Sequence, residues 1–389
     1  MKTRTNTFKP QMEALESRNL MTGSFTWDAS LGLITIRGNA TRNNQVLVTV
    51  ANDNVHVSLN YTDGSGQFIL GPQMEQSNSL VKKIRFLGGS GNDRFTNATD
   101  KVSVAYGYAG NDSLAGGSNN DLLYGGSGDD QLMGRQGDDW LMGEDGNDTY
   151  IFRGTGFLGS DTIIERDGAD YDTLDFSLMS RGVAVDLYQT SIQTVAKQLV
   201  TLDRGPYLPP LRYFVPVLQL TLTNSAASYG NGIERVLATG FDDLIKGNGR
   251  NNILDGRDGN DVLVGRQGND ALFGGNGNDV LIGGWGSDWL EGGNAQDILI
   301  GGTTPAETDM AQLSFIMAEW QRTDIGYMDR VQHLTGETPG GWNGSVLLNA
   351  QLVGNDEAGD MLQGGNNVDW FLARFAALPD RLPTVERNF

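Results

Sequence analysis

Apolar and polar positions along much of this chain recur every nine residues. In each unit, glycines precede an Asp at the sixth position, and an apolar residue follows at the eighth. In residues 88 to 152 the sixth positions are Asp93, Asp112, Asp121, Asp130, Asp139 and Asp148. In residues 238 to 302 they are Asp243, Asn252, Asp261, Asp270, Asp279, Asp288 and Asp297. A charge and an apolar residue kept in step over this length predict a repeat architecture whose units pack on their neighbours.

Both blocks follow the pattern G-G-x-G-x-D-x-U-x, in which U is an apolar residue. This pattern is typical of a parallel β-roll that binds calcium. Two units make one coil of about eighteen residues, with a short strand on each side and a turn at each edge. Eighth-position side chains, such as Leu123 and Leu263, then point inward and form a narrow core. Every second sixth-position residue lies on the same edge of the roll.

The segments outside the repeats predict further strands. Residues 24 to 87 alternate apolar and polar positions in short runs separated by Asn and Gly, which indicates short strands at the start of the roll. Residues 153 to 237 are not repetitive but contain similar runs, so they form a β-rich connecting segment. A cluster of prolines inside it predicts an exposed loop. These prolines are Pro206, Pro209, Pro210 and Pro216.

Residues 303 to 389 have a different character. Thr304 and Glu307 form a capping-box pattern, with Pro305 at the first helical position. An apolar helix face follows, which consists of Leu313, Ile316, Met317 and Trp320. We expect this face to dock on the end of the second roll and cover its open edge. Two degenerate units return at Asp360 and Asp369. The predicted fold class is therefore all-β: a parallel β-roll or β-solenoid in two repeat blocks, with a small helix-containing C-terminal cap.

The spacing of the acidic residues predicts a calcium site between successive coils. Coils lie ~4.8 Å apart, and two bare carboxylates at ~5 Å repel by ~3 kcal/mol at an effective dielectric of ~20. A calcium ion turns this repulsion into attraction, because carboxylate and carbonyl oxygens are its preferred ligands. Fourth-position glycines let the backbone approach the cation. They are Gly110, Gly128, Gly137, Gly146, Gly259, Gly268, Gly277 and Gly286. Without calcium we expect a largely unfolded, self-repelling chain.

Composition limits the partners. The chain has 28 Lys plus Arg against 48 Asp plus Glu, a net charge of -20, which argues against nucleic acid or an anionic membrane and favours cations. It has no cysteine, so neither a disulfide nor a thiolate metal ligand can form. No apolar run approaches the ~18 residues that a membrane span needs. We therefore expect no transmembrane segment and a fold clamped by calcium in place of disulfides.

Residues 88 to 302 resemble the hemolysin-type, or RTX, calcium-binding repeats of secreted bacterial toxins, proteases and polysaccharide-modifying enzymes. Residues 172 to 187 also resemble the β-rich stretch of serralysin-type C-terminal domains. The resemblance implies that the sixth-position Asp and turn carbonyls hold Ca²⁺. Four units depart from the pattern at the fourth position, where they have Asn119, Phe241, Arg250 and Ala295. We expect Asn119 to be tolerated in αL geometry and the sites at both ends of the second block to be weakened.

The N-terminus suggests export. Its residues 1 to 23 are basic and polar and lack the apolar core of an ordinary secretory signal. Within them, residues 15 to 21 (LESRNLM) resemble the L-E-x-R-x-L-L leader of many large exported bacterial surface proteins. The alternative is a disordered basic tail. The leader-like motif and the calcium repeats together indicate a secreted or cell-surface, extracellular location.

A search for catalytic residues finds no convincing set. The two histidines, His56 and His333, are distant in sequence, and the chain has no H-E-x-x-H, G-x-S-x-G or P-loop motif. Acidic pairs such as Asp170 and Asp172 are expected by chance in so acidic a chain. Outward tryptophans could stack on sugars: Trp140, Trp285 and Trp289. We assign no catalytic residue.

These observations favour calcium binding that drives the folding of a secreted or surface-attached, non-enzymatic protein. Such a protein could be an adhesin or matrix component that meets an extracellular polysaccharide or a cell surface. The alternative is a calcium-stabilised carbohydrate-active enzyme or polysaccharide-binding module. An enzyme would lose turnover on a single Asp-to-Asn change while its calcium-loaded fold persisted, whereas an adhesin would keep its binding.

Overall fold

The computed structural model describes residues 23–62, 65, 67–165, 170–202, 211–224, 232–349, 353–354 and 358–372. The leader-like motif at residues 15 to 21 and three of the clustered prolines lie outside the described residues. The fourth, Pro216, lies within a strand and not in a loop. From residue 211 to Val217 this strand pairs on one side only, with its antiparallel neighbour, among the described residues. The other side is therefore an edge, where a proline removes no hydrogen bond of the sheet.

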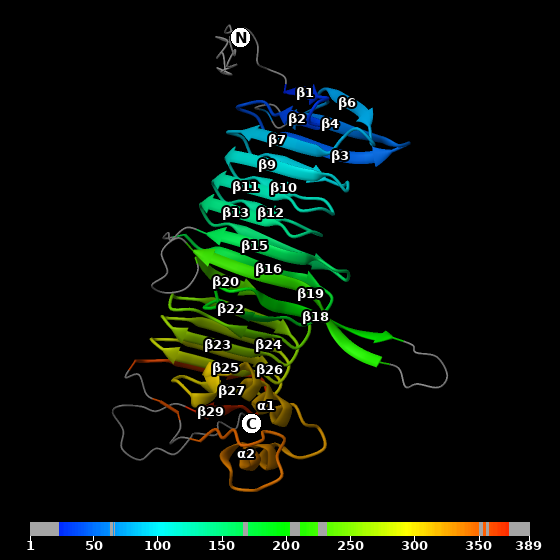
Figure 1. The fold of residues 1–389 in the computed structure, drawn as a ribbon. Coiled ribbons are helices and arrows are strands. Elements are labelled where there is room, and N and C mark those ends of the chain that lie inside the picture. The colour runs from blue at the N-terminus through cyan, green and yellow to red at the C-terminus, as the bar shows by residue number, and fades with distance from the viewer. Residues whose placement is uncertain are drawn as a thin grey trace, which may run out of the picture.

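The roll is built from two layers of mostly parallel strands (Figure 1). One layer is a single 14-stranded sheet that runs the whole length of the roll. In spatial order its strands are β28 (Met361–Gly365), β26 (Trp289–Asn294), β24 (Ala271–Asn276), β22 (Ile253–Asp258), β20 (Ile233–Leu237), β16 (Asp172–Met179), β14 (Thr149–Gly154), β12 (Gln131–Met133), β10 (Ser113–Ala115), β8 (Arg94–Asn97), β3 (Asn44–Ala51), β4 (Asn54–Thr62) and β5 (Phe68–Ile69), with β6 (Gln73–Ser77) paired to β4.

The second layer consists of two sheets in succession. A 9-stranded sheet contains β1 (Ser24–Asp28), β2 (Leu33–Arg37), β7 (Lys83–Gly89), β9 (Val102–Ala109), β11 (Leu122–Ser127), β13 (Trp140–Asp145), β15 (Gly159–Glu165), β19 (Leu211–Asn224) and β18 (Gln193–Leu202). A 6-stranded sheet contains β17 (Ala184–Asp186), β21 (Leu244–Lys246), β23 (Val262–Gln267), β25 (Val280–Trp285), β27 (Ile298–Ile300) and β29 (Trp370–Leu372). The antiparallel β18–β19 hairpin marks the change from one sheet to the other and projects from the roll (Figure 1).

The predicted fold class is confirmed, and the two repeat blocks belong to one continuous roll. The connecting segment supplies β16 and β20, which pair in parallel with each other and with the repeats on either side. At the N-terminal end, β2 and β3 pair in parallel with β7 and β8, so residues 24 to 87 contribute the first coils. Each coil therefore extends the sheets started by the coil before it.

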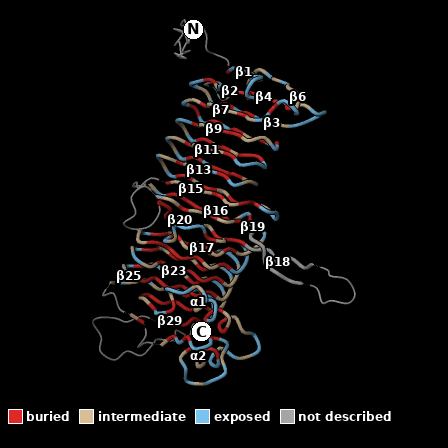
Figure 2. The backbone as a smooth tube through the Cα atoms, viewed as in Figure 1, coloured by how far each residue is buried: buried red, intermediate tan, exposed pale blue. Residues whose placement is uncertain are grey.

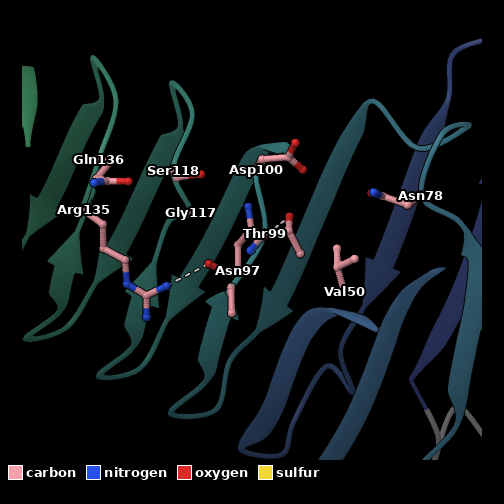
Figure 3. A pocket seen from close by; sticks show the side chains of 10 residues that line it. Val50, Asn78, Asn97, Thr99, Asp100, Gly117, Ser118, Arg135 and Gln136 are labelled. Atoms are coloured by element: carbon pink, nitrogen blue, oxygen red, sulfur yellow. Dashed lines mark hydrogen bonds between the residues drawn. The ribbon is translucent and has the colours of Figure 1, made fainter. Parts of the chain in front are cut away.

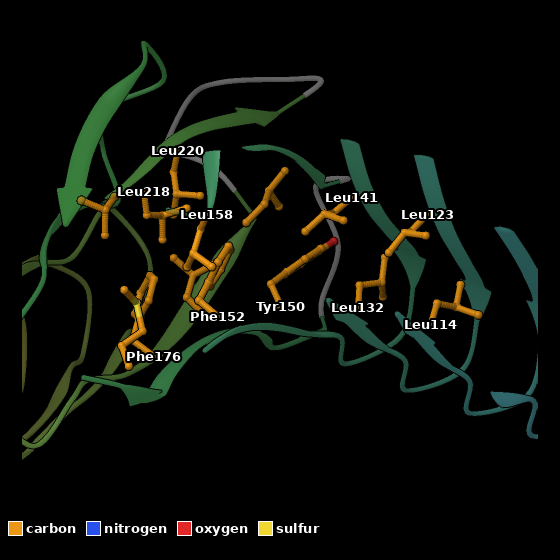
Figure 4. Packing of buried hydrophobic residues seen from close by; sticks show 14 of the residues in the cluster. Leu114, Leu123, Leu132, Leu141, Tyr150, Phe152, Leu158, Phe176, Leu218 and Leu220 are labelled. Carbon is orange, nitrogen blue, oxygen red and sulfur yellow. The ribbon is translucent and has the colours of Figure 1, made fainter. Parts of the chain in front are cut away.

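The core is a row of stacked side chains inside the roll, as the repeat pattern predicts. Eighth-position residues such as Leu123, Leu141 and Leu263 are fully buried. Figure 4 shows this row for the first block, where leucines give way to Tyr150 and then to the stacked rings of Phe152 and Phe176. Buried residues follow the strands along the whole roll, and exposed residues gather at the turns (Figure 2). Each coil adds only a thin row of side chains to this core. The stability of the roll therefore depends on contacts between adjacent coils.

The helical cap contains η1 (Pro305–Thr308), α1 (Met310–Trp320) and α2 (Tyr327–Thr335). The predicted capping box starts the 3-10 turn η1, where the Thr304 N–H donates to Glu307 Oε2 at 3.1 Å. Helix α1 starts separately, after Asp309, whose Oδ1 accepts the Ala311 N–H at 2.8 Å.

The predicted docking position of α1 was wrong. Its apolar face packs on the outer face of the 6-stranded sheet instead of the end of the roll, and the degenerate units form the last described coil, β28 and β29. The sequence explains this placement. In β23, β25 and β27 the seventh and ninth positions are apolar as well as the eighth, so these strands are covered on both faces. The outward residues are Val262, Val264, Val280, Ile282, Ile298 and Ile300, all buried.

Candidate calcium sites at the edges of the roll

Sixth-position carboxylates form ladders along the edges of the roll. In each ladder the Oδ1 atom of one Asp accepts the backbone N–H of the sixth-position residue one coil earlier. The N–H of Asp93 donates to Asp112 Oδ1 at 2.6 Å, and the N–H of Asp112 donates to Asp130 Oδ1 at 2.7 Å. In the second block the N–H of Asp261 donates to Asp279 Oδ1 at 2.8 Å. The structure therefore brings alternate repeats together on the same edge, as the sequence predicts.

The ladders extend beyond the repeats through carboxylates that the sequence did not identify as sites. Each accepts the N–H of a ladder residue at 2.9 to 3.1 Å. They are Asp161, Asp172, Glu234, Asp360 and Asp369. A signal for them exists, because an apolar residue follows two places after each one, as in the repeats. At Asp360 and Asp369 the signal was recognised as two degenerate units, but in the connecting segment irregular spacing hid it, since Asp172 lies 24 residues after its partner.

The second oxygen of most ladder carboxylates is buried and has no hydrogen-bond partner among the described residues. These oxygens are the Oδ2 atoms of Asp93, Asp112, Asp130, Asp139, Asp148, Asp261, Asp270, Asp279 and Asp297. We call the turns that hold them open turns. Burial raises the pKa of Asp139 to about 8 and that of Asp297 to about 9, because a buried charge loses its hydration. A buried, unpaired carboxylate is costly, so each open turn requires a proton or a cation.

First-position glycines make room for these oxygens. A Cβ added at Gly107 would lie 2.0 Å from Asp112 Oδ2 and 2.6 Å from the carbonyl oxygen of Gly125 in the next coil. At Gly274 the corresponding distances are 2.4 Å to Asp279 Oδ2 and 2.5 Å to the Gly292 carbonyl oxygen. A carboxylate oxygen and a backbone carbonyl oxygen therefore border one small space. These oxygen donors suit Ca²⁺, and the absence of nitrogen or sulfur donors among them disfavours zinc.

Alanine at Gly107 is expected to damage one open turn. Its methyl group would overlap Asp112 Oδ2, so we expect the calcium-loaded protein to lose about 1 to 3 kcal/mol of unfolding free energy. The amount of calcium bound per molecule should also fall. Gly156→Ala is the control, because a Cβ there would have no neighbour closer than 3.9 Å. Equal urea midpoints for the two variants in calcium would contradict the role of this glycine.

The fourth-position glycines predicted from the sequence have left-handed backbone conformations. Gly110 has a φ of 112° and Gly277 a φ of 135°, and the other six lie between these values. Side chains other than hydrogen are disfavoured there, so these glycines fix the shape of the turn. That shape leaves the carboxylate oxygen without a backbone donor.

Three turns have another shape, and we call them closed turns. The second-position N–H turns back to the sixth-position side chain, from Gly117 to Asp121 Oδ2 at 2.6 Å and from Thr239 to Asp243 Oδ2 at 2.8 Å. The third is the turn of Asn252, which accepts the Asn248 N–H at 2.9 Å. Both oxygens of Asp121 and of Asp243 thus accept hydrogen bonds. These two predicted ligands lack the unpartnered oxygen of the open turns.

The fourth position separates the closed turns from all the open turns except that of Asp93, whose Gly91 has no positive φ. The closed turns have Asn119, Phe241 and Arg250 there, none of which adopts a positive φ. The expectation that Asn119 would adopt αL geometry was therefore wrong. Ala295 does adopt it, with a φ of 81°, and its turn stays open. Of the four fourth-position residues that carry a Cβ, only Ala295 adopts a positive φ.

Glycine at position 119 is expected to open the closed turn of Asp121. The substitution Asn119→Gly removes the Cβ that disfavours a positive φ, so the Gly117 N–H can release Asp121 Oδ2. We expect the variant to bind one more calcium ion per molecule, measured by atomic emission after gel filtration. Ser118→Gly is the matched control, since it adds a glycine at the neighbouring exposed position. No gain for Asn119→Gly over this control would contradict the explanation.

The remaining candidate residues do not form a catalytic arrangement. His56 lies on β4, where its Nε2 is 3.1 Å from the Ala51 carbonyl oxygen, and His333 lies in the cap with its Nδ1 2.5 Å from Glu319 Oε1. A hollow of about 590 Å³ lies beside the turns of the first block (Figure 3). Within it, Arg135 Nη1 donates to the carbonyl oxygens of Asn97 and Gly116 at 2.8 and 2.9 Å. Asp100 is the one carboxylate among its described lining residues.

Comparison with known families agrees with this geometry. The profile of the RTX calcium-binding nonapeptide repeat matches four times, at residues 106–141, 124–152, 237–272 and 264–299. Both blocks are RTX calcium-binding nonapeptide repeats. The RTX repeats bind Ca²⁺, which is the cation that the buried carboxylates require. The matches leave out the turn of Asp93 and most of the connecting segment. No curated protein matches the chain.

Among the described residues, no helix is long and apolar enough to cross a membrane.

Proposed function

We propose that this RTX protein is secreted or attached to the cell surface, is not an enzyme, and folds when calcium fills its open turns. The observation that carries the proposal is the row of buried Oδ2 atoms without hydrogen-bond partners. In the cytoplasm, where calcium is scarce, the chain would stay unfolded and fit for export. Outside, millimolar calcium would fold it, consistent with the weak affinities of extracellular calcium modules.

In this proposal the ions lie between successive coils. The sixth-position carboxylates of the open turns supply the charge, and first-position carbonyls such as that of Gly125 supply neutral ligands. In the folded roll Oδ1 accepts the N–H of the preceding coil, as in Asp130, which leaves Oδ2 for the ion. Each ion would then join two coils.

A pair of neighbouring substitutions tests the ligand assignment. Asp130→Asn removes the charge of a buried ladder residue, and we expect it to lower the calcium bound per molecule and to raise the calcium concentration at which the protein folds. Asp129→Asn removes the same charge from the neighbouring exposed residue and should change neither. Identical calcium content in the two variants would rule out Asp130 as a ligand. Cell fractionation tests the location: recovery of the protein only from the cytoplasm would contradict export.

The acidic pair Asp170 and Asp172 and the pair Asp242 and Asp243 each have one carboxylate in a ladder, which supports a non-enzymatic role. Asp172 is buried and its Oδ1 accepts the N–H of Asp148 at 2.9 Å. Asp243 is buried in a closed turn. A glycosidase needs two carboxyl groups that face each other across the scissile bond. These carboxylates serve the ladders instead.

A second candidate function, polysaccharide binding, is favoured by a hollow of about 390 Å³ on the second block. Two exposed aromatic rings, Tyr188 and Trp285, line it together with amide and hydroxyl side chains. The guanidinium of Arg266 lies 5.4 Å from the centre of the Tyr188 ring and pairs with Asp186 at 2.6 Å, so its charge is balanced. Trp285 stands at a third position where most other repeats have small or polar residues. Glu307 also lines the hollow, and exposed rings beside such polar groups suit a sugar chain.

Affinity electrophoresis in gels containing neutral polysaccharides tests this second function. Trp285→Ala should abolish any retardation of the calcium-loaded protein. Trp140→Ala is the matched control, since Trp140 is 50% exposed and Trp285 52%. Equal retardation of both variants would exclude this hollow as the binding site.

A further inference from the structure

One group of buried carboxylates extends beyond the repeat turns. It lies where the first block meets the connecting segment and joins Asp148 and Asp172, which are consecutive in one ladder, to Glu165 at the end of β15. One oxygen from each of the three lies within 4.8 Å of the other two. All three side chains are buried, with 1% exposure or less.

The register of the strands explains how Glu165 enters this group. β13 pairs with β15 so that Leu141 lies beside Ile163 and Met142 beside Ile164, and Gly143 and Glu165 are the next residues on the two strands. Gly143 is a first-position glycine, and a Cβ added there would lie 2.0 Å from Asp148 Oδ2. In the coils of the first block this row is glycine. The connecting segment therefore places a carboxylate where the repeats leave a space beside the ladder oxygen.

Tyr150 holds Glu165 in this position. It occupies an eighth position where the neighbouring repeats have leucine, and its hydroxyl is hydrogen-bonded to Glu165 Oε1. The same hydroxyl accepts the N–H of Gly143 at 2.7 Å. The phenol is fully buried, and its longer side chain reaches a carboxylate that leucine could not contact. Tyr150 thus orients Glu165 and supplies no charge.

The two aspartates of the group have no basic partner in the part of the chain that the structure describes. Among the described residues, neither Asp148 nor Asp172 forms an ion pair with a lysine or arginine, and Asp148 Oδ2 has no hydrogen-bond partner. This fully buried oxygen is the independent sign of a missing ligand. Three carboxylates that converge on one space provide the hard oxygen donors that calcium prefers.

We propose that Asp148, Glu165 and Asp172 hold a calcium ion at a site outside the nonapeptide motif, with Glu165 as its distinguishing ligand. The inference rests on the proposed function, because Asp148 also belongs to an open turn. The ion would connect the last turn of the first block to both β15 and β16. It would thereby fasten the connecting segment to the roll on both of its layers.

The substitution Glu165→Gln tests this site in the full-length, calcium-loaded protein. The amide keeps the shape of the side chain and its bond to Tyr150 but removes one negative charge. We expect one calcium ion fewer per molecule by atomic emission, with the far-UV circular dichroism of a folded roll. Asp145→Asn, an exposed change of equal charge in the same turn, should keep the wild-type number. If Glu165→Gln also keeps that number, the site does not exist.

A second measurement needs no variant and covers the case in which Glu165→Gln does not fold. Crystals of the unaltered protein grown with terbium, a calcium substitute, should give an anomalous peak bounded by the carboxylates of Asp148, Glu165 and Asp172. Peaks at the open turns without one here would overturn this inference and leave the proposed function intact. A map without peaks at any open turn would overturn both.

Discussion

Removal of calcium at pH 7.5 is expected to unfold both repeat blocks. A carboxyl group such as Asp270, whose pKa burial raises from 3.8 to about 8, lowers the stability of the folded state by roughly 5 kcal/mol at this pH when it has no cation. Net stabilities of folded domains are only about 5 to 15 kcal/mol. The combined penalty of a few such carboxylates therefore exceeds the stability that the thin core of the roll can provide.

Calcium reverses this balance because it binds only the folded arrangement of the turns. One site at a calcium concentration a hundred times its dissociation constant adds about 2.7 kcal/mol. Since neighbouring ions share the same coils, we expect a cooperative transition. Its measurement is a calcium titration of chelator-treated protein, followed by far-UV circular dichroism and tryptophan fluorescence. Magnesium is the control, because it demands a tighter octahedral shell than these turns provide.

Either result of the titration is informative. A cooperative gain of β-structure with uptake of several calcium ions, not reproduced by magnesium, is the expected outcome. A chelated protein that stays folded at pH 7.5 would show that the buried carboxylates are neutralised by protons or by contacts between coils. In that case the repeats would be a scaffold, and the proposal of calcium-driven folding would fail.

The roll could be predicted from the sequence because a single repeated unit, Asp-x-apolar, determines its geometry. An Asp and an apolar residue two places later define both an edge and a core position, so residues such as Asp130 and Leu132 are placed by spacing alone. Continuity through the connecting segment was not predictable in this way. There the same Asp-x-apolar unit recurs at Asp172 and Leu174, but loops of irregular length separate it from its ladder partners.

The shape of each turn and the docking of α1 could not be predicted from the repeat spacing. Whether a turn is open or closed depends in part on the backbone at the fourth position, where Asn119 avoids a positive φ and Ala295 accepts one. The docking of α1 depends on outward residues such as Val280, which the repeat pattern leaves unspecified. Reading the seventh and ninth positions together with the eighth would have placed the helix correctly.

The calcium-free chain is expected to fold on acidification, against the usual direction of acid denaturation. Burial raises the pKa of Asp130 to about 6, of Asp93 to about 7 and of Asp261 to about 10, all from 3.8. A carboxyl whose pKa is higher in the folded state favours folding while it is protonated. This contribution is complete below about pH 4 and is lost as the pH rises through the folded-state values. Circular dichroism in chelator should therefore show β-structure near pH 4.5 and its loss between about pH 6 and 10.

Calcium and protons compete for the same oxygens, so the calcium-loaded protein should behave in the opposite way. Its apparent calcium affinity is expected to fall as the pH drops from 8 to 6, because ladder carboxyls such as Asp93 take up protons in this range. Asp261→Asn separates the two effects. It replaces the carboxyl with the highest of the three pKa values by a neutral amide, so the chelated variant should stay folded to higher pH while binding less calcium. Asp258→Asn, an exposed change in the same turn, should do neither. A chelated protein equally unfolded at pH 4.5 and pH 8 would show that the carboxylates are not what keeps the coils apart.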